Sequence, residues 1–413
     1  MHPFPTSLED MEALLDTRIE PADRVLAFDS HRIRADDHKL LVEASTVQWL
    51  CTWTRVLGGR TSIEPGIAEA PLDALKRISD TLPGALLGLL DEKAVPEIPK
   101  VAFARYKDAY FKRQRSWPDL NAQDRASLLC LDNIPAAIGL PPQLYPQAPN
   151  RLVASRDQFE HIVNQMIKAV TPEANIRGAI TNHRERLTTI LHELFKNTHD
   201  HARTTVDRQP LLLSIRGMYA RYYTAEQLAY TAPAPVKDDE GNDIPSTLNQ
   251  AENYASYFTR PRALAPNTRL VPLPDRHFLG LLEISVFDTG PGFAYTYLKD
   301  GYAGSSAQQQ FEAVLGCFST GRSSTGDENR GYGLWKVLRD LKELKGFIRV
   351  RTNRVHVYRD FAWYGNMFLQ TDVASPAERM MDWRRGITQK MTEGYPDIQG
   401  AHVSILIPLG DNL

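Results

Sequence analysis

The chain has 413 residues, of which 42% are hydrophobic and 24% are charged, and its formal net charge at pH 7 is −2. This composition is typical of globular proteins, and the charge provides no overall positive field for nucleic acid or an anionic membrane. No apolar run approaches the roughly 18 residues that span a bilayer, and the start of the chain lacks a signal-peptide pattern, so no membrane association is predicted.

The length predicts two or three domains. The three cysteines, Cys51, Cys130 and Cys317, lie far apart and form no CxxC pair or His/Cys metal spacing. Neither a disulfide framework nor a zinc site is predicted, and a reducing, cytoplasmic compartment is the expected location.

The first 150 residues are predicted to form a mainly helical N-terminal domain of unknown role. Apolar periodicity predicts three helices there: Asp36 to Leu57, Pro71 to Leu90 (broken at Pro83 and Gly84) and Pro99 to Trp117. The proline-rich stretch 141–149 interrupts regular structure and sets the predicted domain boundary at about residue 150.

Residues 151–413 are predicted to form an α+β domain, with helices covering one side of a mainly antiparallel or mixed sheet. The predicted helices are 156–170, 183–202, Phe311–Phe318 and Gly333–Leu344. The predicted strands are Leu211–Met218, Phe278–Phe287, Phe347–Thr352 and Val403–Pro408. Residues 224–276 are polar and proline-rich, which predicts a surface insertion or a partly disordered loop.

The helix predicted over 183–202 places a carboxylate and an amide on one face. Glu193 and Asn197 are four residues apart, so they lie one above the other, and Asp200 and His201 extend that face. An Asn carbonyl can bind Mg²⁺ while phosphates supply further ligands, and a Glu one turn away could orient or deprotonate an attacking water. The alternative is an ordinary solvated helix face.

The apolar strand predicted over Phe278–Phe287 delivers Asp288 to its carboxyl end. Gly290 and Gly292 follow, and glycines allow backbone conformations and close approaches that a Cβ would obstruct. A carboxylate in this place can accept a hydrogen bond from an exocyclic amine such as adenine N6. The alternative is a strand followed by a tight turn, in which Asp and Gly are common.

Residues 319–331 form a Ser, Thr and Gly-rich segment without an apolar anchor, which predicts a lid that a ligand would order. Gly331 and Gly333 open the next predicted helix, where free N–H groups favour phosphate. Arg322, Arg330 and Lys336 could add positive charge. The alternative is a flexible surface loop.

The order of these three segments resembles the GHKL ATPase superfamily, which includes type II topoisomerases, heat-shock chaperones, MutL proteins and sensor histidine kinases. Glu193 and Asn197 match its N box. The motif from Asp288 to Gly292 matches the first glycine box, and Gly331-x-Gly333-Leu334 matches the second. The resemblance covers roughly residues 155–410, and each motif is common by itself.

The resemblance implies a Bergerat fold, an α/β sandwich that holds ATP between helices and a lid. It implies that Asn197 coordinates Mg²⁺, that Asp288 binds adenine, and that Glu193 stands where hydrolysing branches activate water. The chain departs from the pattern of this superfamily in two places. Ala401 stands where members often have Thr, and the connection between the first two motifs is long because of residues 224–276.

The nucleotide-binding residues predicted in this way are Asn197, Asp200, Asp288, Gly290, Gly292, Thr320, Arg322, Arg330, Gly331, Gly333, Leu334 and Lys336. Glu193 is the predicted catalytic residue, and Asn197 is the predicted Mg²⁺ ligand.

Three function classes follow, and the first is favoured. An ATPase switch would close its lid on ATP and signal its state to a protein partner, with an ATP-linked homodimer expected by analogy. A protein kinase of the histidine-kinase or anti-sigma kind would need a phosphoacceptor, for which His38 is the one candidate in a predicted helix. Asp200 favours the topoisomerase-type branch, because kinases of this superfamily often carry a basic residue there.

The third class is an ATP-sensing or DNA-associated module that turns over little. The basic and aromatic segment Arg105–Arg115 could contact a phosphate backbone, or could be an ordinary solvated helix face. Arg349, Arg351 and Arg354 alternate along a predicted strand and just past it, and they could be surface residues or part of an interface.

Overall fold

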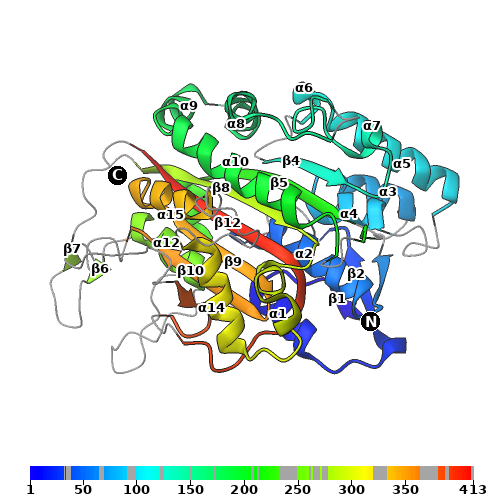
Figure 1. Ribbon diagram of the computed structural model, residues 1–413. Coiled ribbons are helices and arrows are strands. Elements are labelled where there is room, and N and C mark those ends of the chain that lie inside the picture. The colour runs from blue at the N-terminus through cyan, green and yellow to red at the C-terminus, as the bar shows by residue number, and fades with distance from the viewer. Residues whose placement is uncertain are drawn as a thin grey trace, which may run out of the picture.

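The computed structural model describes residues 1–31, 33, 39–64, 69–90, 98–120, 125–147, 151–171, 173–205, 209–211, 214–231, 249–259, 262–263, 270–271, 278–319, 333–362, 380–386 and 390–410. It is an α+β protein in which a large antiparallel sheet and a small parallel sheet are combined with helices (Figure 1).

The described α-helices are α1 (Leu8–Asp16), α2 (Val42–Arg55), α3 (Pro71–Arg77), α4 (Leu82–Leu90), α5 (Lys100–Arg113), α6 (Trp117–Leu120), α7 (Ala136–Gly139), α8 (Arg156–Val170), α9 (Ala174–Thr181), α10 (Arg184–His201), α11 (Ala225–Thr231), α12 (Gln250–Thr259), α13 (Phe293–Leu298), α14 (Ala307–Phe318) and α15 (Gly333–Glu343). Two 3₁₀ turns, η1 (Pro21–Asp23) and η4 (Lys299–Gly301), are also present.

The large sheet has seven strands in the order β11-β10-β9-β12-β8-β5-β4, and every neighbouring pair is antiparallel. Its strands are β4 (Arg125–Leu131), β5 (Ile215–Thr224), β8 (Phe278–Asp288), β9 (Phe347–Asn353), β10 (Val355–Asp360), β11 (Met381–Asp382) and β12 (Ile398–Gly410). A separate two-stranded ladder joins β6 (Arg262–Ala263) to β7 (Leu270–Val271). Of the two alternatives predicted for this sheet, its described strands are all antiparallel, so the sheet is not mixed.

The helices predicted in the second half are confirmed by α8, α10, α14 and α15, and the predicted strands by β5, β8, β9 and β12. Ser155 and Ser306 close capping boxes with Gln158 and Gln309, which explains why α8 and α14 begin where they do. Strands β4 and β10 were not predicted. Strand β5 begins four residues later than the predicted start at Leu211. It also extends past the predicted end at Met218 to Thr224, where Arg221 interrupts the apolar pattern.

Besides helices, the first 150 residues contain a parallel sheet that was not predicted, which consists of β1 (His2–Pro3), β2 (Val25–Asp29) and β3 (Arg60–Glu64). Parallel neighbours need a long crossover, and α1 and α2 supply the two crossovers here. Figure 1 shows this sheet at the end of the molecule where the N-terminus lies. Strands of two to five residues are too short for periodicity to reveal.

Two parts of the chain have helices that differ from the prediction. The break within 71–90 comes before Pro83, not at it, because Pro83 is the second residue of α4, where a helix tolerates proline. Within the predicted insertion 224–276, α12 packs against the large sheet through Ala251, Tyr254 and Phe258, which are buried at helical spacing.

Helices cover both faces of the large sheet. On one face lie α8 and α10, which contact β5, and α10 also contacts β8. On the other face lies α2, which contacts β8 and β12, so the N-terminal and C-terminal parts share this sheet. Strand β4 also comes from before residue 150, and it is an edge strand of the same sheet. A domain boundary at about residue 150 stays a prediction.

Candidate functional site

Helix α10 presents the predicted N-box residues on its half-buried face. Leu187, Ile190, Leu191, Leu194 and Phe195 form the opposite, buried stripe, as the sequence predicted. Glu193 and Asn197 are half-buried. Within the described residues, the Asn197 side chain makes no hydrogen bond, so its amide is available to a ligand.

The start of α15 lies directly against Glu193. An ideal Cβ built on Gly333 would stand 2.5 Å from Glu193 Oε2, so the Glu193 carboxylate could keep its present position only while residue 333 has no side chain. Lys336 Nζ lies 3.8 Å from Glu193 Oε1, and Leu334 is buried. The structure therefore brings together Glu193, Gly333 and Lys336, which the sequence had placed in different motifs.

Asp200 lies at the end of the same face and is exposed. Its carboxylate accepts from Lys196 Nζ at 2.8 Å. Partial burial raises the pKa of Asp200, but the hydrogen bond and charge of Lys196 outweigh this effect and lower the pKa below its usual value. Lys196 therefore occupies Oδ2, so a ligand would bind this carboxylate through Oδ1 or displace Lys196.

Asp288 ends β8 and is held by backbone groups from two segments. Its Oδ1 accepts from Gly290 N at 2.9 Å and from Ala401 N at 3.2 Å. Ala401 therefore contacts Asp288 through its backbone, although it lacks the hydroxyl that a Thr would offer. Both hydrogen bonds that the described residues donate to this carboxyl fall on Oδ1.

Burial is the main electrostatic influence on Asp288. It raises the pKa of this carboxyl to about 6, and the two backbone donors and the charge of Arg216 reduce the rise. Arg216 of β5 lies directly opposite Asp288 of β8 in the strand register, so both side chains project from the same face of the sheet. Arg216 Nη1 lies 3.5 Å from Thr198 Oγ1 of α10, which identifies this face as the α10 side.

The two glycines after Asp288 are required by close packing within the chain. A Cβ at Gly290 would lie 2.6 Å from Ala202 Cα at the end of α10. A Cβ at Gly292 would lie 2.5 Å from Asn353 Oδ1 and 2.6 Å from Thr352 Oγ1, and Gly292 has a φ of +85°. The first glycine box thus fixes the Asp288 turn against α10 and β9, which is a different role from approach to a ligand.

Gly400 is a further residue of this turn that the sequence did not identify as conformationally special. Its φ is +78°, and a Cβ there would stand 1.9 Å from the Asp288 carbonyl oxygen. We expect Gly400→Ala to lower the free energy of unfolding by about 3 kcal/mol or more, because backbone strain and a backbone clash add.

The measurement is denaturant unfolding with Gly178→Ala as the matched control. A Cβ at Gly178 meets nothing within 4 Å, and this residue lies in α9, so the control should be neutral or slightly stabilising. Equal stability of the two variants would contradict the packing described at Gly400.

Four predicted nucleotide-binding residues lie outside the described residues: Thr320, Arg322, Arg330 and Gly331. The predicted lid over 319–331 is likewise outside them except for Ser319, and so is His38. Ser319 is the C-cap of α14, and the next described residue is Gly333 at the start of α15.

Thr352 and Asn353 are residues of the turn that sequence reasoning missed. Thr352 Oγ1 accepts from Phe293 N at 3.0 Å and donates to Gly400 O at 2.8 Å. Asn353 has a φ of +48°, and Asn tolerates this left-handed conformation better than most residues. An Asn at the end of a predicted strand is the one signal that the sequence offered.

A second polar cluster surrounds Glu43 on the other side of the sheet, beside a small cavity lined also by Arg113 and Ser127. The Glu43 carboxylate accepts from Tyr219 Oη at 2.7 Å, from Leu82 N at 2.9 Å and from Arg125 Nη1 at 3.1 Å. These partners join α2 to α4, β4 and β5, so we assign this cluster to the packing of α2 and not to a ligand site.

Among the residues that the structure describes, no group of three or more His, Cys, Asp or Glu side chains is arranged to hold a metal ion. A Mg²⁺ bound at Asn197 would therefore need oxygen ligands from a nucleotide and from water. The described helices also include none with the length and apolar character required to cross a membrane.

Comparison with known proteins adds no relative. No family model matches the chain, and no curated protein and no solved structure shows a significant match to it.

Proposed function

We propose that this protein binds ATP with Mg²⁺ at the α10 face of the large sheet, in a Bergerat-type fold of the GHKL kind. One observation carries this proposal. Three motifs that are far apart in the sequence meet around one helix. The Asp288 turn packs against the end of α10 through Gly290, and the start of α15 packs against its middle through Glu193 and Gly333.

In this proposal, Asp288 recognises the adenine base through a hydrogen bond. An ionised carboxylate can accept a hydrogen bond from an exocyclic amine but cannot donate one to a keto group, so adenine is preferred over guanine. Since Oδ1 is occupied by two backbone donors, Oδ2 is the atom for the base. The buried position strengthens this interaction because water competes less.

Phosphates would lie between α10 and the start of α15. Asn197 would bind Mg²⁺ through its side-chain oxygen together with phosphate oxygens and water. The first N–H groups of α15, an eleven-residue helix, and the charge of Lys336 would attract the phosphates. Glu193 would then accept a proton from a water that attacks the terminal phosphate, which gives ADP and inorganic phosphate.

Slow hydrolysis with a switch in conformation is the use that best fits this site. The segment 319–331, which the sequence predicts to be a lid, lies between α14 and α15 in the chain and would close over the bound nucleotide. Binding of ATP would close the lid, and hydrolysis would open it. The protein that reads this state is unidentified, and an ATP-linked homodimer remains an expectation by analogy.

The test of this function uses ATP labelled on its terminal phosphate, incubated with protein and Mg²⁺. We expect free phosphate to be released, and Asn197→Ala to reduce Mg²⁺-dependent ATP binding at least about tenfold because a metal ligand is lost. Asn182→Ala is the control, since Asn182 is exposed at the end of α9.

Each outcome of this assay is informative. Unchanged binding by Asn197→Ala would contradict the site assignment. Label retained on the protein instead of released as phosphate would identify a kinase, and the labelled residue would then be mapped. Binding that does not respond to a chelator would exclude the role given to Mg²⁺.

A further inference from the structure

The sheet face that α2 covers is unusually rich in charged groups. Arg349 and Arg351 of β9 are buried there, together with His356 of β10. Arg349 Nη1 donates to Ser45 Oγ of α2 at 2.9 Å, and Gln48 Nε2 donates to Arg351 O at 3.0 Å. The alternating arginines of the sequence are therefore neither solvated nor a free interface, except for Arg354 at the turn, which is exposed.

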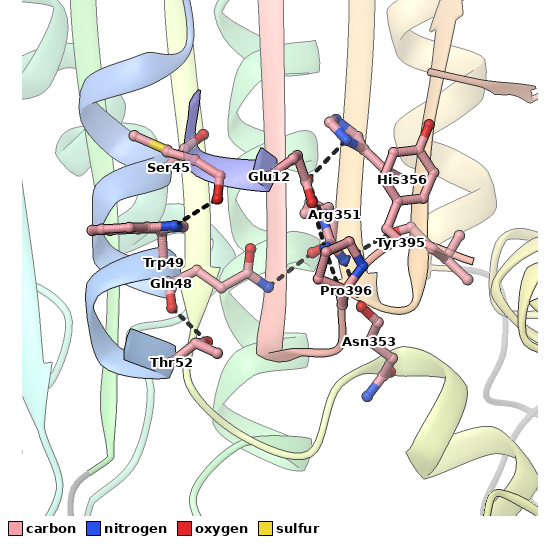
Figure 2. A network of polar contacts seen from close by, with 12 residues as sticks. Glu12, Ser45, Gln48, Trp49, Thr52, Arg351, Asn353, His356, Tyr395 and Pro396 are labelled. Atoms are coloured by element: carbon pink, nitrogen blue, oxygen red, sulfur yellow. Dashed lines mark hydrogen bonds and ion pairs between the residues drawn. The ribbon is translucent and has the colours of Figure 1, made fainter. Parts of the chain in front are cut away.

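Glu12 of α1 is the acidic partner of this cluster. Arg351 donates to it through two nitrogens, at 2.6 Å to Oε1 and at 2.9 Å to Oε2 (Figure 2). His356 Nδ1 lies 3.2 Å from Glu12 Oε1, and its Nε2 accepts from Arg349 Nε at 2.7 Å. Burial by itself would raise the pKa of Glu12, but the Arg351 and His356 partners hold it well below its usual range.

A continuous set of contacts leads from this ion pair to the Asp288 turn. Arg351 Nη1 also donates to the carbonyl oxygen of Asn353. The Asn353 side chain then donates to Pro291 O at 2.9 Å and accepts from Ala294 N at 3.1 Å and Tyr295 N at 3.4 Å. One amide thus holds the loop after Asp288 and the first turn of α13.

A gain in stability is a weak explanation for a buried ion pair. Arg351 is 1% exposed and Glu12 is 16% exposed. Removing two charges from water costs several kcal/mol each, and apolar residues in their place are often equally or more stabilising. What a bidentate pair offers instead is a fixed geometry, and here it fixes β9 and its terminal turn relative to α1.

We propose that Asn353 is the positioning residue of the loop that follows Asp288, and that helix α1 controls this loop through the ion pair of Glu12 with Arg351. The N-terminal helix and the loop are then coupled in both directions, because linkage is reciprocal. The coupling itself is a property of the fold. Its consequence for nucleotide affinity rests on the function proposed above.

The first arm of the test measures hydrogen exchange without nucleotide. Asn353→Gly removes the amide but keeps a residue that accepts a φ of +48°, and Glu12→Gln removes the charge on α1. Both variants should speed the exchange of the amides of Phe293, Ala294 and Tyr295. Asp16→Asn is the control, since Asp16 is exposed on the same helix.

The second arm titrates ADP with Mg²⁺ and measures ATP hydrolysis. Asn353→Gly and Glu12→Gln should weaken ADP binding about fivefold to tenfold and raise KM for ATP similarly, while kcat stays within about twofold. A merely structural defect would lower the amount of folded protein and with it the apparent kcat, and would leave KM unchanged. Asp16→Asn should behave as the unchanged protein.

The outcomes separate the two proposals. If the unchanged protein binds no adenine nucleotide, the proposed function fails, and the exchange arm still decides the coupling. Faster exchange confined to α1 in Glu12→Gln, with the loop amides unchanged, would overturn the coupling. If Glu12→Gln does not fold, Asn353→Gly tests the coupling from the loop to α1. In that variant, hydrogen exchange in the second half of α1 should become faster.

Discussion

Asp288→Asn is expected to make the protein more stable at pH 8 while it weakens ATP binding. Asp288 is a buried carboxyl whose pKa is raised to about 6 from an ordinary value of 3.8. A neutral amide in the same place avoids the cost of a buried charge, and its Oδ1 can still accept from Gly290 N and Ala401 N.

The pH dependence follows from the direction of this shift. Since the folded-state pKa lies above the unfolded value, the folded protein binds more protons between about pH 4 and pH 6, and stability falls as pH rises through this window. Above pH 6 the folded protein bears the full cost of the buried charge on Asp288. The difference between the folded and unfolded pKa values corresponds to a cost of about 3 kcal/mol. We therefore expect Asp288→Asn to gain up to about 3 kcal/mol at pH 8 and nothing at pH 4.

The loss of binding has a separate cause. An Asn amide can turn its NH₂ group toward the exocyclic amine of adenine, which also donates, so the hydrogen bond is lost. Hydrogen bonds to charged groups contribute about 1.5–3 kcal/mol, which corresponds to weakening of roughly tenfold to a hundredfold. In the unchanged protein, the affinity for ATP should also fall as pH drops below about 6, because the carboxylate becomes protonated.

These effects are measured by denaturant unfolding at pH 4 and pH 8 and by ATP titration at pH 8. Asp300→Asn is the control, since Asp300 is exposed in η4 beyond the same loop. A variant that is no more stable at pH 8 would show that the buried charge is already compensated. Unchanged ATP affinity would mean that adenine is read elsewhere.

Glu193→Gln is expected to lower the rate of ATP hydrolysis by about a hundredfold or more while ATP affinity stays within about threefold. Gln keeps the size of the side chain and the contact with Gly333, but it cannot accept the proton of an attacking water. The Lys336 ammonium lies 3.8 Å from Glu193 Oε1, so it can attract the carboxylate and can move to a phosphate when one binds.

Single-turnover hydrolysis and ATP titration together test this expectation. Glu185→Gln is the matched control on the same helix, since the Glu185 side chain is 90% exposed. We also expect Gly333→Ala to slow hydrolysis, because the added Cβ displaces the Glu193 carboxylate, which can move at little cost to stability. Loss of ATP binding by Glu193→Gln would assign a structural role to Glu193 instead.

The motifs that were visible in the sequence are those whose geometry is local. Four-residue spacing within one helix places Glu193 and Asn197 on one face wherever that helix lies. The apolar run before Asp288 predicts a strand for the same reason, and β8 confirms it. Such patterns depend on backbone periodicity, which a short stretch of sequence determines by itself.

The sequence could not show which segments meet. The contact of Gly292 with Thr352 and Asn353 joins residues about 60 apart, and the hydrogen bond from Ala401 to Asp288 joins residues 113 apart. The burial of Arg351 depends on Glu12, which is 339 residues away. A charged residue on a strand is normally solvated, so its burial becomes evident only once its partner is placed.

The sequence by itself therefore determined the type of four of the eight helices and four of the eight strands that the structure describes in residues 151–413, the composition of the predicted nucleotide site and the order of its motifs. Only the tertiary structure decided that Gly290 and Gly292 pack against the chain itself, that α2 covers the second face of the sheet, and that an ion pair joins α1 to β9. The physical reason is that local periodicity sets secondary structure, whereas burial, close approach and charge pairing arise from contacts between distant segments.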